Sequence, residues 1–436
     1  MTVRLPWHRL STSAVLRPAA PRLGTRLNHR ILGLTVRNFR TLTDVKLPLG
    51  ALTVMVGPNA AGKSNVLHAL KFLGDVARKG IEPAVDTRGG FDVLAFRGGA
   101  KPVSRISIGV TGIWSGFASA GDPDRYELTI NRPRLPERAR ERYTTYRGER
   151  LFQHPSADAP TSVELTRDQL FVTDAGNAEP LTLVASSGRM VSALQHPSPL
   201  PDGSPSAEAI AAVSRHLQQI RVFDPDVRAA RQPSPISGEG RHLDDNAANL
   251  ADFLKTLYEI RDQEQDGRRV IWENLLRDVR TVIPNIEDIH LVDVPERSDY
   301  ISVELEESGL RGRTRLKDAS FGTVRLLCLL AVFHDPNPPL LTCIEEIDHG
   351  IHPHALELLA GRLREASRRA QFLVTTHSPA FVNELTPEEF VVCERDRDGS
   401  SIIPAYTTDE VRERIEASEG MPIGELWFAN ALGGGL

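Results

Sequence analysis

Residues 57–65 read GPNAAGKSN and stand between the apolar run LTVMV (52–56) and the helix-like segment VLHALKFL (66–73). The first eight residues fit G-x-x-x-x-G-K-[ST], a loop whose backbone N–H groups surround nucleotide phosphates. A strand before this loop and a helix after it are the structural context that the pattern requires. The sequence therefore predicts an α/β fold with a nucleotide held by the following residues: Gly57, Pro58, Asn59, Ala60, Ala61, Gly62, Lys63, Ser64 and Asn65.

The residue types of this loop have distinct tasks. Gly57 and Gly62 lack a Cβ, so the backbone can approach the phosphates closely. Lys63 is expected to reach the β- and γ-phosphates, and the Ser64 hydroxyl to bind Mg²⁺. The helix that begins near Lys63 adds its positive end. These residues predict a nucleoside triphosphate with Mg²⁺ and do not distinguish ATP from GTP.

A second segment, LLTCIEEID (340–348), reads as a buried strand that ends in two adjacent carboxylates. Glu345 is placed to hold the magnesium ion or its water ligand. Glu346 is placed to orient and activate the attacking water as a general base. The alternative is a pair of surface acids after a strand, and the phosphate loop argues against it.

A third segment, LVTTHSP (373–379), is a β-branched strand that ends at His377. A histidine there can hydrogen-bond the γ-phosphate and report its presence; a capping or core histidine is the alternative. Further histidines stand at positions 349, 352 and 354. A metal cluster is one interpretation of them, but they lack cysteine and a fixed ligand spacing.

A fourth segment, DASFGTVRLL (318–327), places Ser320 and Gly322 just before a helix. This resembles a second phosphate-binding helix start within one chain. Taken alone, the segment would be interpreted as an ordinary helix N-cap.

The order strand, helix, strand, helix after residue 286 predicts an α/β fold with a parallel sheet. The nucleotide domain is expected to be split by an insertion of mixed helices and strands. We expect a tail at residues 1–30, an N-terminal half with an antiparallel flap at 31–190, an inserted linker and helical lid at 191–285, and a C-terminal half at 286–436. Strand IRVF (220–223) lies inside the insertion.

Composition is that of a globular protein, with 40% hydrophobic and 25% charged residues and a net charge of −5. The longest apolar run, LLCLLAVF (326–333), is too short to cross a bilayer, so we expect a cytoplasmic protein without membrane contact. The three cysteines (Cys328, Cys343 and Cys393) stand in apolar segments and predict buried thiols in a reducing compartment.

Two basic segments have open interpretations. Residues 1–30 contain six Arg and no acid, which predicts a disordered basic tail, with a transit peptide as the alternative. Residues 132–150 hold seven Arg against three Glu. A solvated hairpin and a strip that contacts nucleic acid are both compatible with them.

Together these segments resemble the ABC-type ATPases, in the branch that includes the SMC, RecF and overcoming-lysogenisation-defect (OLD) proteins. The resemblance is strongest to the compact "AAA domain" ATPases of bacteria, and it covers most of residues 31–433. It rests on the opening LTVRNFRTLTDVKLPLGALTVMVGPNAAGKSNVLHAL, on HLDDNAANLADFL, on TTHSP and on IGELWFANALGGG.

The resemblance implies an arrangement that the spacing does not show. Two chains would enclose two ATP molecules, each lying between the phosphate loop of one chain and Ser320 and Gly322 of the other. Glu346 would be the catalytic base, Glu345 the magnesium-binding acid and His377 the switch. Together with Lys63, Glu346 and His377 form the expected catalytic set.

Some positions depart from the family pattern. ASFGT replaces the usual Leu-Ser-Gly-Gly-Gln signature, and Phe321 stands where compact relatives often have Asp. EEID replaces their EEPE, with Ile347 and Asp348 at the last two positions. No glutamine is assigned to the loop that links Mg²⁺ to the rest of the domain.

The sequence favours some functions over others. A transporter ATPase is disfavoured because 255 residues separate Ser64 from Ser320, and an SMC protein because heptad arms are missing there. The 57 residues after Pro379 are too few for an OLD-type nuclease domain, so we expect an ATPase without one. The favoured function is a dimeric or larger ATP-driven sensor or motor for DNA or anti-phage defence, acting with a separate nuclease or toxin subunit. A nucleotide-dependent scaffold with slow turnover and no DNA contact is the alternative.

Overall fold

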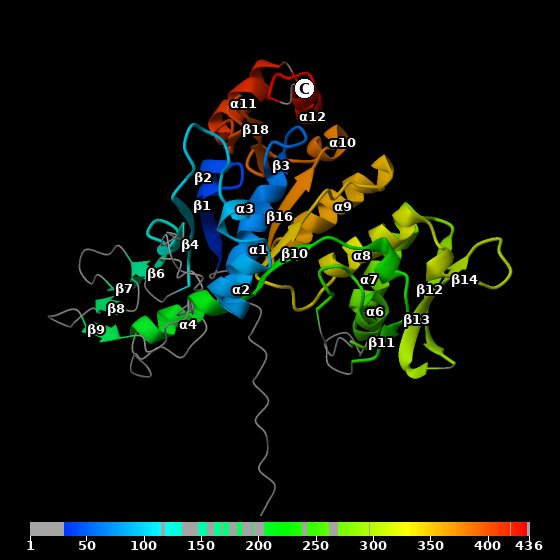
Figure 1. Ribbon diagram of the computed structural model, residues 1–436. Coiled ribbons are helices and arrows are strands. Elements are labelled where there is room, and N and C mark those ends of the chain that lie inside the picture. The colour runs from blue at the N-terminus through cyan, green and yellow to red at the C-terminus, as the bar shows by residue number, and fades with distance from the viewer. Residues whose placement is uncertain are drawn as a thin grey trace, which may run out of the picture.

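The computed structural model describes residues 30–114, 118–132, 147–154, 161–166, 169–173, 181–184, 194, 205–237, 242–260, 269–295, 297–418 and 420–433. These residues form a central parallel sheet between two outer layers, with a smaller lobe beside it (Figure 1). This is the expected α/β architecture. Within the described residues, no helix is both long and apolar enough to cross a membrane.

The central sheet has five parallel strands in the order β10-β15-β16-β3-β17. They are β3 (Leu52–Val56), β10 (Ile220–Phe223), β15 (Leu341–Ile344), β16 (Gln371–Thr376) and β17 (Phe390–Val392). Val374 of β16 pairs with Ile344 on one side and with Val54 on the other. The segments that follow β3, β15 and β16 therefore leave the sheet side by side at one edge, because the carboxyl ends of parallel strands meet there.

Both faces of this sheet are buried, and successive side chains alternate between two cores. Met55 and Leu373 face a core formed with helix α1 (Lys63–Lys79) and the antiparallel sheet. Val54 and Phe372 face the opposite core, formed with α8 (Phe321–Phe333) and α9 (Pro353–Ala366). The apolar runs that the sequence showed before each motif are thus strands covered on two sides.

The antiparallel sheet has eight strands in the order β2-β1-β4-β5-β6-β7-β8-β9. They are β1 (Ile31–Phe39), β2 (Leu42–Pro48), β4 (Arg105–Gly112), β5 (Asp124–Asn131), β6 (Arg147–His154), β7 (Thr161–Thr166), β8 (Gln169–Thr173) and β9 (Leu181–Val184). Helices α2 (Ile81–Asp86), α3 (Phe91–Leu94) and α4 (Pro205–Gln218) accompany it. Strands β4 and β5 are the antiparallel pair expected for the flap.

The smaller lobe lies on the other side of the parallel sheet. It contains α5 (Val227–Ala230), β11 (Ser234–Pro235), α6 (Leu250–Glu259), α7 (Val270–Val282), β12 (Ile286–Val294), β13 (Arg297–Glu307), β14 (Arg313–Arg315) and a 3-10 turn at Leu316–Asp318. Asp278 of α7 is buried and accepts two hydrogen bonds of 2.7 Å from Arg362 of α9 and one of 2.7 Å from His334. A satisfied buried carboxylate thus fixes this lobe to the central domain.

The C-terminal segment returns to the edge of the sheet where β3, β15 and β16 end. It contains α10 (Pro379–Val382), β18 (Glu394–Arg395), β19 (Ser401–Ile402), α11 (Thr408–Ala417) and α12 (Ile423–Phe428). The hydroxyl of Ser401 in β19 donates to the Thr41 hydroxyl over 2.7 Å, so this hairpin lies beside the turn between β1 and β2.

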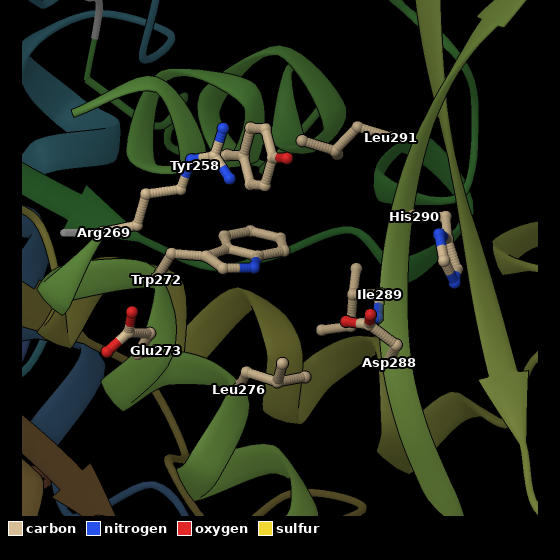
Figure 2. A pocket seen from close by; sticks show the side chains of 9 residues that line it. All are labelled: Tyr258, Arg269, Trp272, Glu273, Leu276, Asp288, Ile289, His290 and Leu291. Atoms are coloured by element: carbon tan, nitrogen blue, oxygen red, sulfur yellow. The ribbon is translucent and has the colours of Figure 1, made fainter. Parts of the chain in front are cut away.

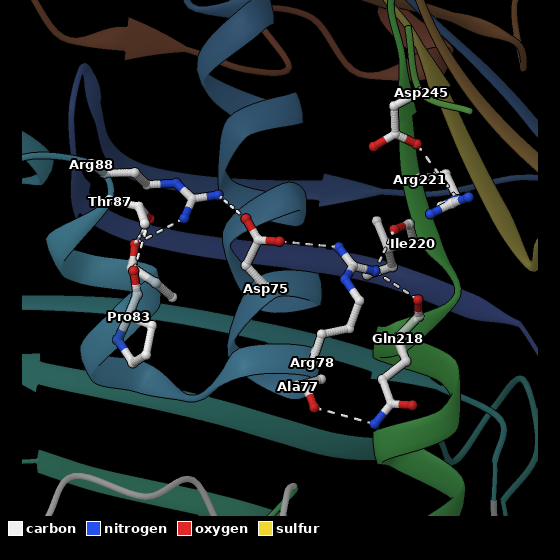
Figure 3. A network of polar contacts seen from close by, with 11 residues as sticks. Asp75, Ala77, Arg78, Pro83, Thr87, Arg88, Gln218, Ile220, Arg221 and Asp245 are labelled. Carbon is white, nitrogen blue, oxygen red and sulfur yellow. Dashed lines mark hydrogen bonds and ion pairs between the residues drawn. The ribbon is translucent and has the colours of Figure 1, made fainter. Parts of the chain in front are cut away.

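A polar network fastens helix α1 to the edge of the parallel sheet (Figure 3). Asp75 accepts hydrogen bonds from Arg78 (3.3 Å) and Arg88 (2.5 Å). Arg78 donates onward to the carbonyl oxygens of Gln218 (2.7 Å) and Ile220 (3.2 Å), where α4 ends and β10 begins. The helix that carries Lys63 is therefore held at both its apolar and its polar face.

The position of strand β10 differs from the expected one. Its residues 220–223 belong to the segment 191–285 that the sequence assigned to the insertion, yet they pair in parallel with β15 in the central sheet. The parallel sheet thus includes a strand that lies before residue 286 in the sequence. Residues 1–29 of the basic tail, and 133–146 of the Arg-rich segment, lie outside the described residues.

Candidate functional site

The site lies at the edge of the sheet where β3, β15 and β16 end. A cavity of about 230 Å³ opens there. It is lined by Thr41, Asn59, Ala60, Gly62, Lys63, Ser64, Asn65, Glu346, Thr375, His377 and Arg395. The structure thus brings the phosphate loop together with the second strand-end acid and the histidine, although more than 250 residues separate the loop from these two residues.

The loop itself has a backbone that few sequences can adopt. Gly62 has φ 106°, and a Cβ there would lie 2.1 Å from the Ser401 hydroxyl oxygen. Ala60 also has a positive φ, of 65°. A glycine at position 62 is required by both conformation and space. As a result helix α1 starts without a side-chain cap, which leaves N–H groups of its first turn for a ligand.

Lys63 is buried, with 6% of its surface exposed. Its ammonium donates hydrogen bonds to the carbonyl oxygens of Gly57 (2.8 Å) and Pro58 (3.0 Å). Burial lowers the pKa of Lys63, while nearby carboxylates, Glu346 and Asp348 among them, act to raise it. The cation is therefore held over the loop by neutral carbonyls, which an anionic phosphate can replace at an electrostatic advantage.

Ser64 and Glu345 meet across the site. The Ser64 hydroxyl donates a short hydrogen bond to a carboxylate oxygen of Glu345, which stands directly after β15. A hydroxyl and a carboxylate are hard oxygen ligands of the kind that Mg²⁺ takes beside nucleotide phosphates. The two residues fit the predicted magnesium site, and the Thr41 hydroxyl lies in the same cavity.

Glu346 occupies a constrained backbone position. Its φ is 47°, in the left-handed region that non-glycine residues rarely adopt. The Glu346 N–H donates to the Thr375 hydroxyl over 2.9 Å, and its carboxylate lines the cavity with 46% of the side chain exposed. A base in this place can reach a water molecule beside a bound γ-phosphate.

His377, directly after β16, also lines the cavity. Burial, followed by the positive charge of Lys63, lowers the pKa of His377, while Glu346 and Asp348 oppose the shift. The imidazole is therefore neutral near pH 7 and can donate one hydrogen bond. Asp348 fixes this segment, because one of its oxygens accepts from the Thr376 hydroxyl (2.6 Å) and from the His377 N–H (3.3 Å).

Three residues near the site were not singled out from the sequence. Arg395 lines the cavity and donates to the carbonyl oxygen of Ala60 over 3.3 Å. Arg40 donates to Asn65 of the loop over 3.3 Å, and Asn65 donates to Thr41 over 2.7 Å. The Arg40–Thr41 pair stands in the opening stretch that resembles the family, which is a usable signal. Arg395 has no sequence signal, since its place depends on the β18–β19 hairpin.

Ser320 and Gly322 are not among the residues that line this cavity. Ser320 is exposed and caps α8, because its hydroxyl accepts from the Thr323 N–H over 3.0 Å. The ordinary N-cap interpretation therefore holds within one chain. The side chain that the resemblance assigns to a phosphate faces solvent instead of its own phosphate loop.

A larger cavity, of about 470 Å³, lies between α7 and β12 in the smaller lobe (Figure 2). Tyr258 and Trp272 pack edge to face there with centroids 5.3 Å apart, and the Arg269 guanidinium lies 3.7 Å from the Tyr258 ring centroid. The lining also includes the acids Glu273 and Asp288 and the basic side chains Arg269 and His290. This aromatic cavity is distinct from the nucleotide site.

Two family matches cover both halves of the site. Residues 30–94 match the family described as "AAA ATPase domain", and residues 221–383 match the one described as "AAA domain, putative AbiEii toxin, Type IV TA system". A stretch of 44 residues is 59% identical to the OLD nuclease of Thermus scotoductus. That match takes in 10% of this chain and 8% of the nuclease, so less than a tenth of the relative is covered.

Solved structures of Smc head domains share the fold. One, bound to the C-winged helix domain of ScpA, is 17% identical with a TM-score of 0.50, covering 88% of this chain and 99% of that one. Another, with an extended coiled coil and the C-terminal domain of ScpA, derives from Pyrococcus furiosus. It is 16% identical with a TM-score of 0.51, covering 90% of this chain and all of that one. The likeness confirms the predicted fold, that of ABC-type ATPase heads.

Proposed function

We propose that this chain, which is similar to AAA-family ATPase domains in sequence and to Smc head domains in fold, binds ATP with Mg²⁺ and hydrolyses it between two copies of itself. One observation carries this proposal. Lys63, Glu346 and His377 converge on one cavity at the edge of the parallel sheet, while Ser320 at the start of α8 is exposed on the surface. One chain therefore supplies the phosphate loop, the base and the histidine, and leaves a second helix start free for another chain.

Binding follows from the loop. The uncapped first turn of α1 and the Lys63 ammonium would hold the β- and γ-phosphates. Ser64 and Glu345 would hold Mg²⁺, which supplies charge neutralisation of the phosphate oxygens. The bond between Ser64 and Glu345 places both ligands before the ion arrives.

Hydrolysis would use Glu346 as the base. Its carboxylate accepts a proton from water as the water oxygen bonds to the γ-phosphorus. The bond from the γ-phosphorus to the β–γ bridging oxygen breaks, and ADP leaves with that oxygen and the bonding electron pair. His377, held through Asp348, donates a hydrogen bond to the γ-phosphate, where negative charge must be stabilised.

The biological role is proposed at a coarser level. The 44-residue identity to a protein named OLD nuclease and the match to a family described with a putative AbiEii toxin both favour a DNA-related or defence role. In that role the ATPase acts as sensor or motor for a separate effector subunit. If the protein is instead a nucleotide-dependent scaffold, it will assemble stably without DNA and turn ATP over slowly.

The decisive experiment measures the solution mass of Glu346→Gln with and without ATP and Mg²⁺. The substitution removes the base and retains the Lys63 and Ser64 contacts, so ATP should double the mass of this variant. Lys63→Ala, which lacks the phosphate contact, should remain a monomer. A mass that is already high without nucleotide, and does not change on adding ATP, would replace the two-chain ATPase by the scaffold.

A further inference from the structure

Helix α8, which begins at the exposed Ser320, touches the loop that carries Glu346. Arg325 of this helix is 4% exposed. Its guanidinium donates hydrogen bonds to the carbonyl oxygens of Glu345 (3.1 Å) and Glu346 (2.9 Å). A buried cation on the helix thus holds the backbone of both strand-end acids.

The backbone conformation of Glu346 is unusual, and its hydrogen bonds maintain it. Its left-handed φ of 47° is unfavourable for a residue with a Cβ. Thr375 accepts from its N–H, and Arg325 donates to its carbonyl oxygen, so both polar groups of the peptide are fixed. The Glu346 carbonyl oxygen also accepts from the His349 N–H over 2.9 Å, so loss of the Arg325 contact would loosen this backbone without freeing it.

A second contact joins the same helix to the Glu346 side chain. His349 Nδ1 lies 3.2 Å from a carboxylate oxygen of Glu346. The His349 ring packs against the Phe321 ring, with centroids 5.6 Å apart and planes tilted by 38°. Phe321 follows Ser320 directly and is 44% exposed, which makes it a large apolar ring on the same surface.

Two glycines make this contact close. A Cβ on Gly350 would lie 2.4 Å from the Phe321 ring, and Gly350 has a φ of 68°. A Cβ on Gly322 would lie 2.7 Å from the Gly350 carbonyl oxygen. The start of α8 and residues 345–350 therefore pack backbone against backbone, and a displacement of one is transmitted to the other.

We propose that α8 positions the Glu346 loop of its own chain, with Arg325, His349 and Phe321 as positioning residues, and that this contact couples the two ATP sites of a dimer. The proposal rests on the two-chain site described above. ATP bound on one chain meets Ser320 and Phe321 of the other chain. This contact moves α8 of the chain that contributes Ser320 and Phe321. Through α8, it positions the Glu346 carboxylate of that same chain at the second ATP, which is bound to that chain's own phosphate loop.

The first test needs neither nucleotide nor a dimer. Amide hydrogen exchange of residues 345–350 is measured in the free chain for wild type, Phe321→Ala and Arg325→Lys. Lysine keeps the charge, but its ammonium lies one bond nearer the backbone than Nη2, the arginine atom that donates to both carbonyl oxygens. Both variants should exchange faster there, by roughly 10-fold or more if the loop opens locally. Phe428→Ala, at a phenylalanine that is 77% exposed, is the matched control and should not change it.

The second test measures coupling by steady-state ATPase kinetics. In His349→Ala, kcat should fall roughly 10-fold while KM changes less than about 2-fold, because the carboxylate is misplaced but the phosphate loop is intact. The Hill coefficient should fall from above 1 toward 1. His349→Gln, whose amide can still donate to Glu346, should recover most of kcat. His354→Ala, an exposed histidine stacked on His352, should behave as wild type.

The outcomes separate the two proposals. Unchanged exchange at 345–350, or an unchanged Hill coefficient in His349→Ala, overturns the coupling even when Glu346→Gln dimerises with ATP. Equal losses in His349→Ala and His349→Gln also overturn it. Faster exchange in the variants of a chain that never dimerises supports the positioning role of α8 and removes the two-chain function and the coupling with it.

Discussion

Helices α1 and α8 begin in opposite surroundings, and their first backbone N–H groups therefore have different partners. Helix α1 begins at Gly62, with no side chain to accept its first N–H groups, inside a cavity walled by its own chain. Helix α8 begins at Ser320, whose hydroxyl already caps the helix, on the exposed surface. An uncapped, enclosed helix start keeps its first N–H groups available for an anion, whereas at the second start the Ser320 hydroxyl already accepts from the Thr323 N–H. The first start is thus suited to bind phosphates within its own chain, and the second is a capped helix end exposed on the surface.

The largest effect should come from Lys63. Lys63→Ala is expected to weaken ATP binding by roughly 100-fold or more, because a charge-assisted contact to the phosphates is removed. Isothermal titration calorimetry measures this directly. Lys79→Ala, exposed at the far end of the same helix, is the control and should bind as wild type. Equal affinities for Lys63→Ala and wild type would show that the α1 start is not the phosphate site.

Ser320→Asp examines the other helix start. Aspartate caps a helix as well as serine does, so thermal stability should be kept, while its charge would repel a partner's triphosphate. ATP binding to the single chain should be unchanged, and ATP-dependent mass doubling should be lost, with hydrolysis falling roughly 10-fold or more. Ser320→Asn caps without charge and serves as the control. A dimer that forms equally well with aspartate would place the partner's phosphates elsewhere.

Glycine substitutions compare a crowded position at the start of α8 with an open position inside α9. Gly322→Ala places a Cβ 2.7 Å from the Gly350 carbonyl oxygen and should reduce the free energy of unfolding by about 1–3 kcal/mol. Gly361→Ala, inside α9 with open space around the new Cβ, should instead stabilise by about 0.5–1 kcal/mol. Urea unfolding measures both. Similar values for the two variants would contradict the close contact at α8.

The smallest effect concerns His68 of α1. Burial, with Arg40, Lys71 and Arg88 nearby, lowers its pKa to about 4 from an ordinary value of 6.5. Between these values the unfolded chain binds the extra proton, so this residue's contribution to stability rises with pH from about 4 to 6.5 and is lost in acid. Because the ring is partly exposed, about 1–2 kcal/mol is expected after screening.

His68→Gln retains an acceptor for Arg40 that does not titrate, and the contact between Arg40 and His68 makes this a conservative change. Urea unfolding of wild type and variant should differ in pH slope between about pH 4 and 6.5. Parallel slopes would mean that His68 is protonated in the folded chain, which the Arg40 contact opposes.

Most of the site was predictable because its motifs are local. The loop at 57–65, the acids after β15 and His377 after β16 each follow an apolar strand, and parallel strands bring their ends to one edge. Strand β10 was missed as part of the core because four residues at a sheet edge look the same as a strand in an insertion. Arg325 was missed because an arginine in an apolar helix shows its role only through the carbonyl oxygens it meets.

The sequence by itself determined the phosphate loop, the order of the acids and histidine, and the class of the fold, because strand and helix periodicities and glycine positions act over short distances. The tertiary structure decided the rest. It decided that the β18–β19 hairpin brings Arg395 to the loop, that Ser320 faces outward, and that Phe321, His349 and Arg325 meet Glu346. Such contacts depend on how separate elements pack, and residue spacing along the chain does not encode those distances.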